Sequence, residues 1–70
     1  MNVKKELGSK IKRLRQKEGL TQEQFAEKLN IATRTLAGIE IGESFVSAQT
    51  IENILNYFKI SFEDFLSPVI

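Results

Sequence analysis

The chain has 70 residues, of which 41% are hydrophobic and 27% are charged, and its formal net charge is +1. A chain of this length makes one domain, spanning residues 1–70, and it buries only about 60% of the surface that its unfolded form exposes. It contains no cysteine and no histidine, which excludes disulfides, thiolate chemistry, the commonest metal ligand and the commonest general base.

The charge is divided unevenly along the chain. The segment from Met1 to Gly19 contains seven basic and two acidic residues, a net charge of +5, whereas Leu20 to Ile70 contains three basic and seven acidic residues, a net charge of −4. This asymmetry favours a polyanionic partner, although a solvated basic face on an ordinary helix explains it equally well. The basic start of the chain leads into no apolar run, so we expect neither a secretory signal nor a membrane span.

The first predicted helix runs from about Lys4 to Glu18. Leu7, Ile11 and Leu14 step by four and three residues, which places one apolar stripe on a helix. Gly19 follows at a natural C-terminal cap position.

The second and third predicted helices lie between Gln22 and Ile41 and are joined by a tight turn. Thr21 and Gln24 have the spacing of a capping box, in which each side chain bonds the other residue's backbone N–H. Asn30 tolerates the left-handed backbone that a sharp turn needs. The inner faces of the two helices and the turn are expected to consist of small or apolar residues, namely Phe25, Ala26, Leu29, Ile31, Leu36 and Ile39.

Two more helices are expected after a loop at residues 43–46. Ser47 can cap the fourth helix, whose buried face would contain Ile51, Ile54, Leu55 and Phe58, with Ile60 at its end. Ser61 can cap a short fifth helix that ends at Pro68, with Phe65 and Leu66 pointing inward. Glu63 and Asp64 lie in its first turn, where adjacent side chains diverge, so we interpret them as capping charges and not as a catalytic acid/base pair.

The pattern from Phe25 to Ile39 resembles the helix-turn-helix unit of the lambda-repressor-like (Cro/C1 or Xre-type) DNA-binding domains. Those domains carry apolar residues at the positions of Phe25, Leu29, Ile31, Leu36 and Ile39, a small residue at Ala26, and Gly or Asn at position 30. The resemblance implies an all-α, five-helix fold that covers residues 11–66, with the helix-turn-helix unit at residues 22–41. Ala26 and Asn30 would support the motif structurally.

The resemblance also implies an ion pair between Arg15 and Glu40. In the related domains an Arg late in the first helix pairs with a Glu that ends the third helix, and both positions match here. Such a pair would hold the third helix, which recognises DNA in those domains, against the first helix. It would also let Arg15 face a phosphate. The alternative is two unpaired surface charges.

The third helix would present its outer face to the major groove of DNA. The residues assigned to base readout are Thr33, Arg34, Ala37 and Gly38, of which only Arg34 can make a bidentate contact to guanine. The residues assigned to the DNA backbone are Gln22, Arg13, Arg15, Lys17 and Ser44.

The chain departs from the family at Ala32, where a Ser or Thr cap is usual, and at Ile41 and Glu43, where basic or amide residues are common. Gln22 is expected to point outward from the start of the second helix.

The resulting interpretation is a sequence-specific regulator of transcription that binds double-stranded DNA in the cytoplasm, with no enzymatic activity, cofactor, metal or small-molecule ligand. A homodimer on a palindromic operator is expected, with Phe65, Val69 and Ile70 as candidate contacts. The subfamily stays open between a phage-type repressor, a restriction–modification controller and a similar small bacterial regulator. The alternative is an antitoxin-like or other protein-interaction module that keeps the fold with weak or no DNA binding.

Overall fold

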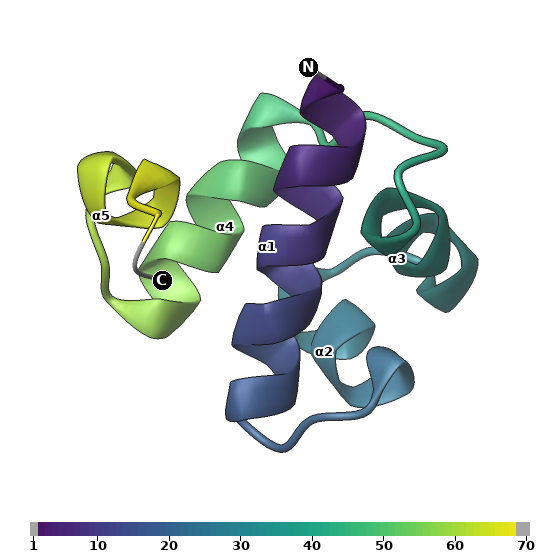
Figure 1. The fold of residues 1–70 in the computed structure, drawn as a ribbon. Coiled ribbons are helices and arrows are strands. Elements are labelled where there is room, and N and C mark those ends of the chain that lie inside the picture. The colour runs from purple at the N-terminus through teal and green to yellow at the C-terminus, as the bar shows by residue number, and fades with distance from the viewer. Residues whose placement is uncertain (1, 69–70) are drawn as a thin grey trace.

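The structure is a computed structural model that describes residues 2–68, and those residues form five α-helices and no strand. The helices are α1 (Val3–Lys17), α2 (Gln22–Leu29), α3 (Thr33–Glu40), α4 (Ala48–Phe58) and α5 (Phe62–Leu66). In Figure 1, α1 runs through the middle of the molecule, with α2 and α3 on one side and α4 and α5 on the other. The expected all-α, five-helix fold is confirmed.

Four of the five helices begin at a side chain that accepts a hydrogen bond from the backbone three residues later. The capping residues are Asn2, Thr21, Ser47 and Ser61, and at α2 the full capping box with Gln24 is present. Ala32 precedes α3 and makes no such bond. The helix that would enter DNA is therefore the one whose start is not held by a side chain.

Left-handed backbone ends several helices. Gly19 follows α1 with φ +74° and Asn30 ends α2 with φ 59°, both as the sequence indicated, and Gly42 follows α3 with φ +81°. Lys59 ends α4 with φ 57°, a conformation that is uncommon for a residue with a Cβ atom. The sequence did not predict this position.

The core lies where all five helices meet. Its buried apolar residues are Ile11, Leu14, Phe25, Ala26, Leu29, Leu36, Ile39, Ile54 and Phe65. The rings of Tyr57 and Phe58 lie 5.9 and 5.7 Å from the ring of Phe25, which connects α4 to the helix-turn-helix. The apolar stripes read from the sequence therefore face inward, except that Ile51 is only half-buried and does not pack against the core.

The end of the chain requires corrections. Phe65 was assigned to a dimer contact, but it is 0% exposed because it fills the core beneath α5, so it cannot touch a second subunit in this fold. Leu66 was expected to point inward and is 50% exposed, because Phe65 alone occupies the inner side of so short a helix. Val69 and Ile70 lie outside the described residues.

Gly8 lets α1 and α3 pack with their backbones in close contact. It is buried in the middle of α1, and a Cβ atom added to it would overlap the carbonyl oxygen of Ile39 and lie 3.1 Å from that of Glu40. Those neighbours are backbone atoms, which cannot rotate away. Only glycine therefore fits at this crossing.

We predict that Gly8→Ala destabilises the domain. Alanine improves helix propensity by about 1 kcal/mol, but overpacking against a fixed backbone costs about 1–3 kcal/mol or more, so the free energy of unfolding should fall. Gly38→Ala is the matched control in α3, because its new Cβ atom would meet only the Ser44 side chain, 3.0 Å away and free to rotate. Urea unfolding measures both variants, and equal effects at the two sites would contradict the prediction.

Candidate nucleic-acid interface

The carboxylate of Glu40 lies at the end of α3 and is almost fully buried, with 1% of its side chain exposed. Arg15 of α1 donates from Nε to Glu40 Oε2 at 2.7 Å and from Nη2 to Oε1 at 3.1 Å. The remaining Nη1 of Arg15 donates to the carbonyl oxygen of Leu20 at 2.7 Å. The predicted ion pair is present, and every nitrogen of the Arg15 guanidinium has a partner within the chain.

Gln22 of α2 joins the same carboxylate. Its Nε2 atom donates to Glu40 Oε1 at 3.0 Å, and the side chain is half-buried. The expectation that Gln22 points outward is therefore wrong: a buried carboxylate needs more donors than one arginine supplies, and Gln22 is close enough to provide one. Through Glu40 the first three helices share one polar contact.

The outer face of α3 carries few polar side chains. Thr33 and Arg34 are exposed, whereas Ala37 and Gly38 are half-buried. Gly38 is partly covered because the following loop folds back on it, and its carbonyl oxygen accepts bonds from the backbone N–H groups of residues 43 and 44. Thr35 is also exposed, although the sequence analysis did not name it. Its place directly before the inward-pointing Leu36 could have indicated its exposure.

The loop after α3 exposes apolar side chains. Ile41 is 57% exposed and Phe45 is 67% exposed, while Glu43 is exposed between them. The ammonium group of Lys4 lies 5.1 Å from the centroid of the Phe45 ring, a cation–π contact that the sequence reading missed because the two residues are far apart in the chain.

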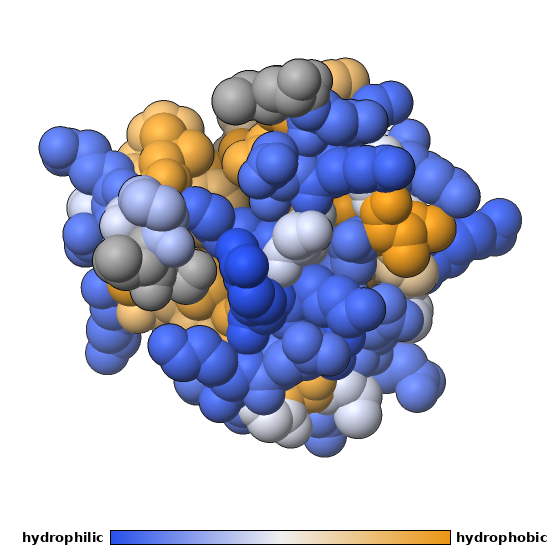
Figure 2. All heavy atoms as spheres, viewed as in Figure 1, coloured by the Kyte–Doolittle hydropathy of each residue, from blue (hydrophilic) through white to orange (hydrophobic). Residues whose placement is uncertain are grey.

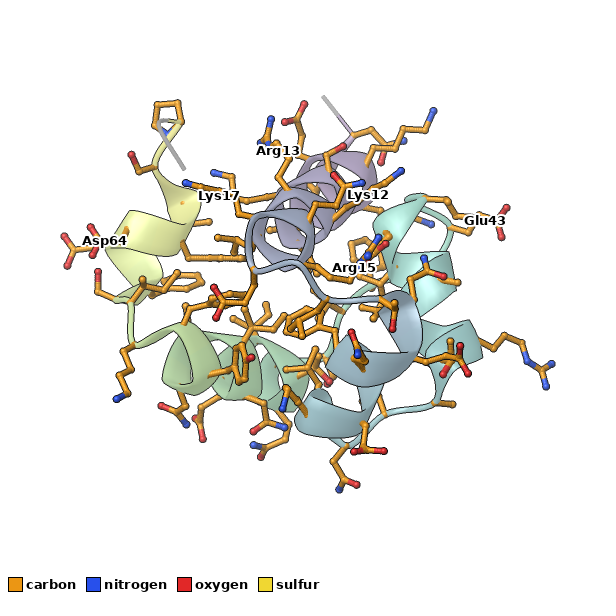
Figure 3. All side chains as sticks on the ribbon, turned by 90° about the horizontal axis from the view of Figure 1, so that it is seen from below. Lys12, Arg13, Arg15, Lys17, Glu43 and Asp64 are labelled. Atoms are coloured by element: carbon orange, nitrogen blue, oxygen red, sulfur yellow. The ribbon has the colours of Figure 1, made fainter. Side chains whose placement is uncertain are left out.

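The basic residues of α1 fall on different sides of the helix. In Figure 3, Lys12 lies on the side of α1 nearer to α3, Arg13 points away from the body of the domain, and Lys17 extends toward α5. Lys5 packs against Gly42 at the end of α3. The structure therefore gathers Lys5 and Lys12 near the recognition helix, and it does not bring Arg13 and Lys17 there.

Residues 2–68 contain neither a metal-ligand cluster nor a membrane-spanning helix. This part of the chain contains no group of three or more acidic, histidine or cysteine side chains that could hold a metal ion. None of its helices is both long enough and apolar enough to cross a membrane.

Comparison with known proteins identifies relatives of this domain. A family model described as helix-turn-helix matches residues 11–65. The HTH-type transcriptional activator BcrR of Enterococcus faecalis is 29% identical over 62 residues, which are 89% of this chain and 30% of that protein. The antitoxin PezA of Streptococcus pneumoniae is 38% identical over 58 residues, 83% of this chain and 37% of that protein.

A third relative is the HTH-type transcriptional regulator ImmR of Bacillus subtilis, 36% identical over 55 residues, which are 79% of this chain and 43% of that protein. The chain thus spans less than half the length of each of these three relatives. No solved structure matches the chain.

We predict that Glu40→Ala lowers the free energy of unfolding by about 3–5 kcal/mol, because it leaves the largely buried Arg15 without its partner. Replacing both partners, as Arg15→Met with Glu40→Leu, should cost much less, since no charge is then stranded. Glu43→Ala is the matched control on the exposed loop and should change stability by less than about 0.5 kcal/mol. Urea denaturation that gives Glu40→Ala and Glu43→Ala the same stability would refute this role for Glu40.

Proposed function

The chain belongs to the Cro/C1-type helix-turn-helix family, and from this premise we propose that it binds double-stranded DNA sequence-specifically as a small regulator of transcription. The observation that carries the proposal is the arrangement of α3, whose inner side is fixed by Glu40 while Thr33 and Arg34 are exposed. Two relatives are named as an HTH-type transcriptional activator and an HTH-type transcriptional regulator, which supports the same function.

In the proposed complex α3 lies in the major groove with its N-terminal residues at the base edges. Arg34 donates two hydrogen bonds to O6 and N7 of a guanine, and Thr33 offers a methyl group to a thymine or a hydroxyl group to a base edge. Ala37 and Gly38 have no side-chain donor, so they allow close approach and add little readout.

Backbone contacts would come from groups around α3. Ser44 is exposed in the loop after α3, and Lys5 and Lys12 lie on the α3 side of α1. We therefore assign phosphate contacts to these three residues. We assign Arg15 a positioning role, because each nitrogen of its guanidinium already donates to Glu40 or to the Leu20 carbonyl.

The regulator would act by occupying its site in the cytoplasm, without catalysis or a cofactor. One α3 helix covers one half-site, so we propose a homodimer on a palindromic operator, with the two recognition helices about 34–36 Å apart.

A second function is favoured by specific observations. The outer face of α3 is poor in donors, Ile41 and Phe45 are exposed beside the acidic Glu43, and one relative is named as an antitoxin. These features fit a module that binds a protein through the same fold. Binding to DNA at low salt decides between the two functions.

We predict that duplex DNA binds and that affinity falls as salt rises, with a log–log slope of roughly 0.9 for each phosphate neutralised. The positive segment from Met1 to Gly19 motivates this expectation. A titration with random and selected duplexes over a range of salt measures the slope. Absence of binding at low salt would favour the protein-interaction module instead.

We predict that Arg34→Ala removes preference at one guanine of each half-site, a loss of about 1–3 kcal/mol of discrimination. The fold should be unaffected, because Arg34 is exposed and the inner face of α3 does not include it. Lys12→Ala is the control: it should weaken binding to all sequences alike and reduce the salt slope.

The measurement compares each variant with the parent on the selected site and on versions in which single guanines are replaced. If Arg34→Ala and the parent discriminate equally at every position, Arg34 does not read a base.

A further inference from the structure

The loop after α3 has no basic residue of its own. Between Arg34 and Lys59 the chain contains no lysine or arginine, and Glu43 is the one charged residue of the loop at residues 43–46. Glu43 is exposed and points away from the body of the domain (Figure 3). The loop is tied to α3, because the carbonyl oxygen of Gly38 accepts bonds from two backbone N–H groups of the loop. A DNA phosphate beside this loop would therefore meet a carboxylate, unless another segment supplies a cation.

α1 places a cation at this loop. The Lys4 ammonium group lies 5.1 Å from the centroid of the Phe45 ring, within the range at which a cation is attracted to the face of an aromatic ring. Asn2 caps the helix turn that carries Lys4, and Val46, directly after Phe45, packs against the core. Both members of the pair therefore stand on backbone that other contacts hold in place.

The donors of Lys4 are not used inside the domain. An ammonium group has three N–H donors, and within residues 2–68 that of Lys4 makes no hydrogen bond and no ion pair. Lys10, farther along α1, differs because its Nζ donates to the carbonyl oxygen of Ser67 at 2.8 Å. The Phe45 ring thus attracts the charge of Lys4 and leaves its donors available to a partner.

An exposed ring could instead belong to a surface that binds a protein. Phe45 and Ile41 are 67% and 57% exposed, but in Figure 2 the hydrophobic atoms on the α3 side of the molecule form a small area enclosed by hydrophilic ones. Scattered apolar side chains are ordinary on a protein surface. The cation beside the ring, and the neighbouring Lys5 against Gly42, favour an anionic partner.

We infer that Phe45 is a positioning residue that presents the Lys4 ammonium group to a DNA phosphate beside the loop. The ring holds the charge at the loop, and the ammonium N–H groups donate to the phosphate oxygens. The contact supplies the cation that the loop lacks, and it adds affinity without sequence preference because it does not involve bases. The inference rests on the proposed function, since it needs DNA as the partner.

The first test measures the salt dependence of binding to the duplex that the domain selects from a random pool. Lys4→Gln should lower the log–log slope by about 0.9, the share of one phosphate. Phe45→Leu keeps an apolar side chain but removes the ring face, so it should lower the slope toward that of Lys4→Gln. Adding Phe45→Leu to Lys4→Gln should then cause no further decrease. Phe45→Trp should keep the parent's slope, because tryptophan offers the best ring face to a cation.

The matched control is the other cation–π contact found within residues 2–68. The Lys28 ammonium group lies 5.9 Å from the ring centroid of Tyr57, which is in the last turn of α4, at the opposite end of that helix from the loop. Lys28→Gln removes the same charge and should keep the parent's slope. Circular dichroism checks that each variant is folded.

A second measurement needs no DNA. The ring current of Phe45 should shift the side-chain NMR signals of Lys4 upfield in the parent, and Phe45→Leu should abolish that shift. Signals of Lys4 that are the same in both proteins would overturn the inference, because the ring would not hold the ammonium group.

The outcomes separate this inference from the proposed function. A parent that binds no DNA at low salt overturns both, and the exposed ring then belongs to the protein-interaction module. If the parent binds DNA and Lys4→Gln keeps its slope, the proposed function stands and the phosphate contact is rejected. If Lys4→Gln lowers the slope but Phe45→Leu does not, Lys4 meets a phosphate without help from the ring, and the positioning role of Phe45 is rejected.

Discussion

The structure depends on one buried carboxylate. Moving a charged group out of water is costly unless opposite charges and donors surround it, and Glu40 is satisfied only when α1 and α2 are both placed to reach it, through Arg15 and Gln22. The carboxylate sits at the C-terminal end of α3, next to the crossing at Gly8. The C-terminal end of α3 is thus held by polar contacts to two other helices, whereas its first turn has no side-chain cap at Ala32.

This unequal support has a physical consequence for recognition. In the proposed complex the held end sets the direction of α3, and the uncapped first turn, which carries Thr33 and Arg34, meets the groove. A helix fixed along its whole length would meet only one groove shape well. A helix free at both ends would have to lose more conformational entropy on binding.

Local features of the fold followed from the sequence, and tertiary ones did not. The capping box at Thr21, the left-handed turn at Asn30 and the inward stripes depend on residues a few positions apart, which is the range over which helix periodicity and capping operate. The orientation of Gln22, the exposure of Leu66 and the close contact at Gly8 depend on which helices meet and how closely. The pairing of Arg15 with Glu40 was the exception, because the family resemblance supplied the long-range contact. For the candidate site, the sequence predicted that Thr33 and Arg34 are exposed. It did not predict which basic side chains of α1 lie on the side that faces α3.

The residue at the position of Gly8 also bears on the spacing between the first and third helices in related sequences. Because any side chain at this position would overlap the α3 backbone, a sequence with alanine or serine there must hold its first and third helices farther apart. The larger gap would have to be filled by bulkier neighbours on both helices, so changes at these positions should occur together during divergence. We therefore expect the residue at this position of α1 to indicate how closely the first and third helices of a related domain approach each other.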